Sequence, residues 1–118
     1  MTPTVPHAVQ SCHELLLWLI PQLDKFPRAR RFTLGERIEA GLLEVLELLV
    51  EAAYTRNKDT PLRRVNLKLA VVRHLWRLAH ELKVTATRQY EHGARLIDDL
   101  GRQIGGWLRS QPTSEPHS

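Results

Sequence analysis

Apolar residues recur at helical spacing in four stretches of the chain, and no stretch shows the alternation expected of a half-buried strand. The spacing predicts helices over residues 8–26, 34–55, 61–83 and 86–109. The short connections between them force successive helices to lie antiparallel. The pattern therefore predicts an all-α fold, an up-down four-helix bundle forming a single domain over residues 1–110, and a Pro- and Ser-rich tail over 111–118 that is expected to be disordered.

Residues with known preferences at helix ends set the predicted boundaries. Pro21 falls inside the first helix and is expected to kink or split it. Thr33 and Glu36 match the T-x-x-E capping box at the start of the second helix. Thr60 and Pro61 suit the N-cap and the first position of the third helix.

The predicted third helix is apolar over more of its circumference than one buried stripe requires. One side carries Val65, Leu69, Val72, Trp76 and Ala79, and another carries Leu67, Val71, Leu75, Leu78 and Leu82. The surplus indicates a second buried face, most simply against another subunit of a homo-oligomer. The alternative is a helix that is buried on both sides within one domain.

The part of the third helix that is not apolar carries a strip of basic residues along its length. Arg73 and Arg77 are four residues apart and share one side, where they repel each other unless an anion or a carboxylate lies over them. Arg63 lies further back on the same helix, and Arg31 belongs to a short basic segment, 28–32, that is expected to be a loop. The alternative to anion binding is pairing with the glutamates of the second helix.

The fourth helix carries an arginine ridge opposite an apolar seam. Arginines seven residues apart drift by only about 20° per step and so stay on one side; they are Arg88, Arg95, Arg102 and Arg109. The seam consists of Tyr90, Gly93, Ile97, Leu100, Ile104 and Trp107.

Two further features of the fourth helix bear on this ridge. Glu91 and Asp98 precede Arg95 and Arg102 by four residues, so these pairs are expected to form salt bridges and to leave part of the ridge a self-neutralised, solvated face. Gly101 and Gly105 each cost about 1 kcal/mol in a helix interior relative to alanine. They indicate close approach by a neighbouring helix or a large side chain, unless they are simply tolerated near the helix end.

Charge and composition narrow the classes of partner. The net charge of +4 and the isoelectric point of about 9.7 favour anionic partners, whether nucleic acid, phospholipid or an acidic protein. The single cysteine, Cys12, excludes an intramolecular disulfide and favours a reducing cytoplasm. The longest apolar run, 15–20, is far shorter than the roughly 20 residues that span a bilayer, and the N-terminus shows no signal-peptide pattern.

Sequence signals of catalysis are weak. The six histidines are scattered, and the chain has no HExxH motif, no phosphate-binding glycine loop and no E-x-x-H pair of the di-iron bundles. We therefore expect no enzymatic activity, no cofactor and no bound metal.

Several short motifs occur in an order and spacing that resemble one bacterial family of helical bundles. From the N-terminus they are Phe26-Pro27-Arg28, Arg31-Phe32-Thr33-Leu34-Gly35, Ala52-Ala53-Tyr54, Arg73 with Arg77-Leu78, Tyr90, Gly101-Arg102 and Gly105-Gly106-Trp107. The chain from about His13 to Arg109 thus resembles the accessory variability determinants of diversity-generating retroelements. These are relatives of the four-helix bundles encoded in intervening sequences of 23S ribosomal RNA genes.

The resemblance implies a non-enzymatic protein that forms a ring-shaped homopentamer with a basic surface. It also implies association with the reverse transcriptase of the retroelement and with RNA or DNA, in support of mutagenic copying of a template RNA into cDNA. By position, Arg73 and Arg77 match the basic block of the family's third helix. The full set of expected contact residues is Arg31, Arg63, Arg73, Arg77, Arg88, Arg95 and Arg102.

Two other functions are compatible with the same residues. One is a structural bundle of the ribosomal intervening-sequence type that has no retroelement partner. The other is an interaction module for an acidic protein or a membrane surface, although no membrane partner is expected from the leading interpretation.

Overall fold

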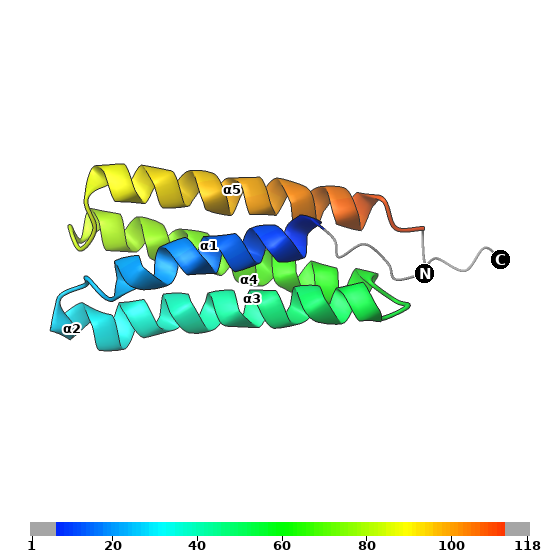
Figure 1. Cartoon of the computed structure of the whole chain (residues 1–118), viewed down its shortest axis with the longest axis horizontal. Helices are drawn as coiled ribbons and strands as arrows, with labels where there is room; N and C mark the ends of the chain where they lie inside the picture. Colours follow the sequence, from blue (N-terminus) through cyan, green and yellow to red (C-terminus); the bar gives the residue numbers. More distant parts are fainter. Residues whose placement is uncertain (1–6, 113–118) are drawn as a thin grey trace.

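A computed structural model describes residues 7–112 of the chain. Over this range it contains four long helices and no strand: α1 (His7–Leu23), α3 (Glu36–Tyr54), α4 (Asp59–Glu81) and α5 (Thr87–Arg109). The four helices lie side by side and each runs antiparallel to the one before it (Figure 1). Helix α3 packs on α4, α4 on α5, and α1 closes the bundle by packing on both α3 and α5. The all-helical bundle expected from the sequence is confirmed, and residues 113–118 of the predicted tail lie outside the described range.

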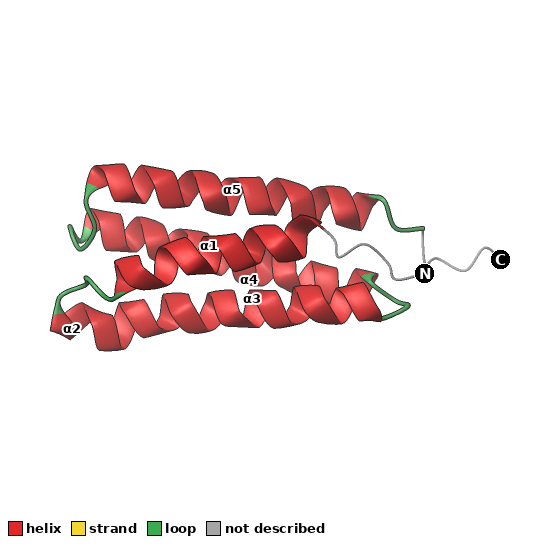
Figure 2. Ribbon diagram, viewed as in Figure 1, coloured by secondary structure: helices red, strands yellow, loops and turns green. Residues whose placement is uncertain are grey.

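The predicted loop at 28–32 is wrong, because this segment is helical. A single turn, α2 (Arg28–Arg30), leads into a π-helical turn, η1 (Arg31–Gly35), and then directly into α3 (Figure 2). Pro27 starts the turn from an extended conformation (φ −54°, ψ 147°), and its carbonyl accepts hydrogen bonds from the amides of Arg30 and Arg31.

This helical entry also removes the predicted capping box. The amide of Glu36 donates to backbone carbonyls of η1, so the start of α3 has no orphan donor there for Thr33 to satisfy. The hydroxyl of Thr33 donates instead to the carbonyl of Ala29, at 3.1 Å.

Other helix ends also differ from the prediction, and two of these differences change the local structure. Helix α1 continues through Pro21 without splitting and ends at Leu23 rather than at residue 26. Helix α4 begins at Asp59, so Thr60 is not its N-cap. The connection is instead closed by Lys58, whose ammonium donates to the carbonyls of Ala52 and Thr55 at 2.8 Å each and so satisfies acceptors at the end of α3.

The core of the bundle is built around Trp76 of α4. Its indole is 1% exposed, and its Nε1 donates to the carbonyl of Tyr90 at 2.9 Å. Gly93 of α5 makes room for the ring, since a Cβ on that residue would lie 2.7 Å from Trp76 Nε1. The predicted seam of α5 is confirmed: Gly93, Ile97 and Leu100 are buried with Ile104, while Tyr90 and Trp107 are half-buried against the core.

The second apolar side of α4 faces solvent in the single chain. We call it the outer strip of α4, and it consists of Leu67, Val71, Leu75 and Leu78 with Leu82, the residue that follows the end of the helix. Leu67 is 68% exposed, and Val71, Leu78 and Leu82 are between 43% and 45% exposed, while Leu75 is half-buried. A helix buried on both sides within one domain is therefore excluded. The strip borders a shallow groove whose opposite wall includes Phe32 and Leu34.

None of the helices in the described range combines the length and the hydrophobicity that crossing a membrane requires.

Candidate nucleic-acid interface

The ridge predicted on α5 is present, and its four arginines are all exposed. From Arg88 to Arg109 it extends over three heptads, or about 30 Å at the helical rise. The drift of about 20° per heptad means that the ridge crosses the helix obliquely. Its two halves consequently border two different grooves, one toward α4 and one toward α1.

The first groove lies between α4 and α5 and has a volume of about 390 Å³. Its charged and polar lining comprises Asn66 and Arg73 from α4 and Asp98, Arg102 and Arg109 from α5. We call it the α4–α5 groove. Three of these five side chains are guanidinium groups against one carboxylate, so the groove has a net positive lining.

Two glycines of α5 form part of the wall of this groove and explain how its arginines lie. A Cβ on Gly101 would be 3.1 Å from Nη2 of Arg73, and a Cβ on Gly105 would be 3.2 Å from Nη1 of Arg109. Both guanidinium groups therefore rest close to the bare backbone of α5. The predicted approach of a large side chain to these glycines is confirmed.

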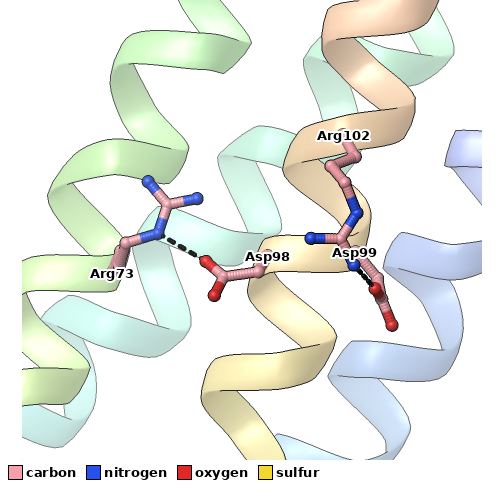
Figure 3. A network of polar contacts seen from close by, with 4 residues as sticks. All are labelled: Arg73, Asp98, Asp99 and Arg102. Carbon is pink, nitrogen blue, oxygen red and sulfur yellow. Dashed lines mark hydrogen bonds and ion pairs between the residues drawn. The ribbon is translucent and has the colours of Figure 1, made fainter.

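Arg73 makes a single ion pair across the groove. Its Nε lies 2.9 Å from Oδ1 of Asp98, and Figure 3 shows the two side chains pointing toward each other from α4 and α5. The side chains are 46% and 52% exposed, so a pair of this kind contributes at most about 1 kcal/mol. The Nη groups of Arg73 make no hydrogen bond to any described residue, which leaves the outer part of its fork available to a ligand.

The salt bridges predicted within α5 do not form. Asp98 pairs with Arg73 of α4 instead of Arg102, and Arg102 pairs with Asp99, three residues before it (Figure 3). No carboxylate of residues 7–112 lies within ion-pair distance of Arg95, and none pairs with Arg88 or Arg109. Three of the four ridge arginines are thus unneutralised by the part of the chain that is described.

The suggested neutralisation by glutamates of α3 is also wrong for Arg73 and Arg77. Arg77 pairs with Glu81 one turn further along α4, at 3.0 Å. Among the described residues, Glu44 is the one α3 glutamate that forms an ion pair, and its partner is Lys68. Helix α3 packs on the flank of α4 that carries Lys68, whereas Arg73 faces α5.

The remaining predicted contact residues lie outside the α4–α5 groove. Arg77 stays on the exposed surface of α4, and Arg63 pairs with Asp59 at the start of the same helix, at 2.7 Å. Arg31 lies in η1 and pairs with Asp24 at 3.2 Å. The structure therefore brings together Arg73 and Arg102 with Arg109, and it does not bring Arg31, Arg63 or Arg77 to them.

The second groove lies between α1 and α5 and has a volume of about 440 Å³. We call it the α1–α5 groove, and its lining residues are Trp18, Gln22, Arg88, Gln89, His92 and Arg95. The ring centroids of Trp18 and His92 are 4.7 Å apart with the planes tilted by 58°. The sequence places Trp18 among the apolar residues of the first helix and does not single out His92, because their meeting depends on how α1 and α5 pack.

Two observations on the described residues concern metal binding and the single thiol. No three side chains of His, Cys, Asp or Glu within residues 7–112 are grouped as a metal site would require. Burial raises the pKa of the Cys12 thiol to about 12, so this side chain stays protonated and packs as an apolar group.

The fold and the two grooves define a four-helix bundle whose last helix presents a continuous row of arginines. The chain belongs to the bAvd-like family, whose model matches residues 8–111. The family resemblance seen in the sequence is thereby confirmed. No curated protein matches the chain.

Proposed function

We propose that this protein is a non-enzymatic accessory protein of a diversity-generating retroelement, working in the cytoplasm. It binds the reverse transcriptase and the nucleic acid being copied, the template RNA or its cDNA, and supports mutagenic reverse transcription. The proposal combines the bAvd-like family membership with the arginine surface of α5.

The observation that carries the nucleic-acid part is the unneutralised ridge of α5. Arg88, Arg95 and Arg109 have no ion-pair partner among the described residues, and Arg102 pairs only with an exposed aspartate. Guanidinium groups bind phosphate oxygens in a bidentate manner and remain charged at all physiological pH values. Contacts of this kind bind the backbone without reading the base sequence, and they weaken as salt rises.

The exposed outer strip of α4 supports the formation of a homo-oligomer. Exposed apolar side chains gathered on one helix are typical of a surface that a second molecule covers. We propose that copies of this chain cover the strip in a ring, with five subunits as the family implies. A ring repeats the ridge once per subunit and so concentrates positive potential that a single chain of charge +4 would not supply.

Nucleic-acid binding is tested with a charge reversal at the centre of the ridge. The variant Arg95→Glu with Arg102→Glu should lose at least tenfold in affinity for RNA, and the slope of log affinity against log salt should fall by roughly 1.4 for a single strand. Fluorescence polarisation at several salt concentrations measures both quantities. The matched control is Lys25→Glu with Arg56→Glu, which reverses two exposed charges away from both grooves. Equal losses in the two variants would show that net charge, and not the ridge, governs binding.

Reverse-transcriptase binding is tested separately on α4. Arg73→Ala with Arg77→Ala should leave the fold and assembly unchanged, because both side chains are exposed, and should abolish capture of the reverse transcriptase in a pull-down. Capture at the wild-type level would remove these two arginines from the proposed contact.

A structural bundle of the ribosomal intervening-sequence type is the alternative function. The bAvd-like match favours the accessory protein over it. The neighbouring genes discriminate between the two, since the proposal requires a reverse transcriptase gene and a repeated template region nearby.

A further inference from the structure

Two aromatic side chains, Trp18 and His92, form the floor of the α1–α5 groove, and the core of the bundle supports Trp18. Trp18 is half-buried, and its ring meets the buried indole of Trp76 edge to face, with centroids 6.2 Å apart and planes at 77°. Trp76 is itself held by its hydrogen bond to Tyr90 and by its contact with Gly93. Trp18 therefore packs against a ring that is itself held in place, and together with the ring of His92 it lines the groove.

The rim of this groove is cationic. Arg88 and Arg95 are two turns apart on α5, about 10 Å along the helix axis, which corresponds to about three nucleotides of a stacked strand. Both are exposed, and neither has an ion-pair partner among the residues described. Gln22 and Gln89 add amide groups that can donate and accept hydrogen bonds at the edge of a base.

We infer that the α1–α5 groove is a binding site for single-stranded nucleic acid, in which an unpaired base stacks on Trp18 and His92 while Arg88 and Arg95 bind the flanking phosphates. The inference rests on the proposed nucleic-acid binding and specifies the form of nucleic acid that the site takes. Only an unpaired base exposes its face to a side chain, because both faces of a paired base are covered by its neighbours in the duplex.

The aromatic floor favours a nucleic acid over an acidic peptide as the occupant. Carboxylates of a peptide would satisfy Arg88 and Arg95 but would make no use of the accessible surfaces of the Trp18 and His92 rings. Aromatic rings beside arginines are the combination that proteins use to bind single strands with little sequence preference.

The first experiment uses the wild-type protein and three forms of one RNA: the single strand, the same strand annealed to its complement, and a strand with abasic positions that keeps every phosphate. We expect the single strand to bind more tightly than either of the others in fluorescence polarisation. Equal affinity for the intact and the abasic strand would overturn the inference while leaving phosphate binding, and hence the proposed function, in place. Binding to none of the three would overturn both.

The second experiment removes the floor. Trp18→Leu should weaken single-strand binding by roughly 5- to 150-fold, the range measured when stacking aromatics are removed, and should reduce the preference for the intact over the abasic strand. Trp18→Phe should retain most of the wild-type affinity, because a smaller ring still stacks. The matched control is Trp107→Leu, which removes a half-buried indole of α5 outside the groove and should leave the preference for the intact strand unchanged.

A variant at His92 tests the groove independently, in case Trp18→Leu does not fold. His92→Ala removes a half-buried side chain from the groove and should lower single-strand affinity while leaving duplex affinity at the wild-type value. Thermal melting followed by circular dichroism checks that each variant is folded. Unchanged single-strand binding in folded Trp18→Leu or His92→Ala would overturn the inference, and competition by polyglutamate as effective as that by RNA would assign the groove to an acidic protein instead.

Discussion

Two glycines of α5, Gly93 and Gly101, are contacted by side chains of different kinds. At Gly93 the neighbour is the buried, planar indole of Trp76, whereas at Gly101 it is the far end of the long arginine side chain of Arg73. The two sites have the same residue in the same helix, but the room to adjust differs between them. The structure therefore assigns opposite consequences to the same substitution.

Gly93→Ala should destabilise the protein and Gly101→Ala should not. The added methyl group at Gly93 would lie 2.7 Å from Trp76 and force core side chains to shift, at a cost of about 1–3 kcal/mol that outweighs the better helix propensity of alanine. At Gly101 the guanidinium of Arg73 can move aside, so the propensity gain of up to about 1 kcal/mol should remain. Urea denaturation of both variants measures the free energies of unfolding, and equal changes would contradict this account.

Cys12 gives a second prediction for a single residue. Burial raises the pKa of its thiol to about 12, so the native protein should react very slowly with thiol reagents at pH 8 and rapidly once it is unfolded. The unfolded thiol loses its proton near the ordinary value of 9.0 and the folded thiol does not, so the free energy of unfolding should fall as the pH rises above 9. Cys12→Ala should remove that part of the slope. Fast labelling of the native protein would contradict the burial.

At the scale of the helix, the residue pattern of α5 predicted more of the structure than the pattern of any other helix. Its seam and its ridge follow from spacing along a single helix, and both were found where the sequence puts them. The ion-pair partners could not be predicted in the same way. On a helical wheel Asp98 lies close to Arg102, but in the structure it pairs with Arg73. The packing of α4 on α5 brings Nε of Arg73 to 2.9 Å from Oδ1 of Asp98. The grooves also require two helices, so neither was visible in the sequence.

The entry to α3 shows the opposite case, in which local sequence signals were misinterpreted. The basic residues of α2 and η1 have no apolar periodicity, so the segment resembled a loop. Its helical form is favoured by the carbonyl of Pro27 and by Phe26 and Leu34, which are buried against the bundle. These tertiary contacts are not encoded in a capping motif.

The pair between α4 and α5 predicts how the α4–α5 groove can be made more basic. Asp98→Asn neutralises the carboxylate that lines the groove among the described residues and so removes its ion pair with Arg73. Stability should change by less than about 1 kcal/mol, because the pair is exposed, and affinity for RNA at low salt should rise by a factor of about 1.5 to 5. Polarisation titrations of Asp98→Asn beside Glu47→Gln, which removes an exposed carboxylate of α3, measure the effect. A gain of the same size in both would assign it to net charge alone.

At the scale of the whole molecule, the sequence predicted the bundle and the surplus of apolar surface on α4. Both follow from hydrophobic periodicity, and the outer strip is exposed in the single chain, as expected of a face that another molecule covers. The number of subunits does not follow from periodicity, because it depends on the angle at which two copies meet. That part of the expectation stays a prediction from the family.

Charges placed on the outer strip should prevent assembly without unfolding the subunit. Val71→Glu with Leu78→Glu adds two carboxylates at positions that are 45% and 43% exposed in the single chain, so the fold should tolerate them. In an interface the same carboxylates would be desolvated, at several kcal/mol each. Light scattering should report an oligomer for the wild type and a monomer for the variant, with His74→Glu, an exposed position of α4 outside the strip, as the control. A monomeric wild type at micromolar concentration would contradict the proposed oligomer.

The oblique course of the arginine ridge gives the surface a handedness. A strand that follows the row would leave the side of α1 and arrive at the side of α4, so it would cross the subunit at a slant rather than parallel to the bundle axis. Copies related by rotation keep the same slant. In the proposed ring, a nucleic acid passing from one subunit to the next would therefore wind around the assembly in one sense only, because every subunit presents the same slant.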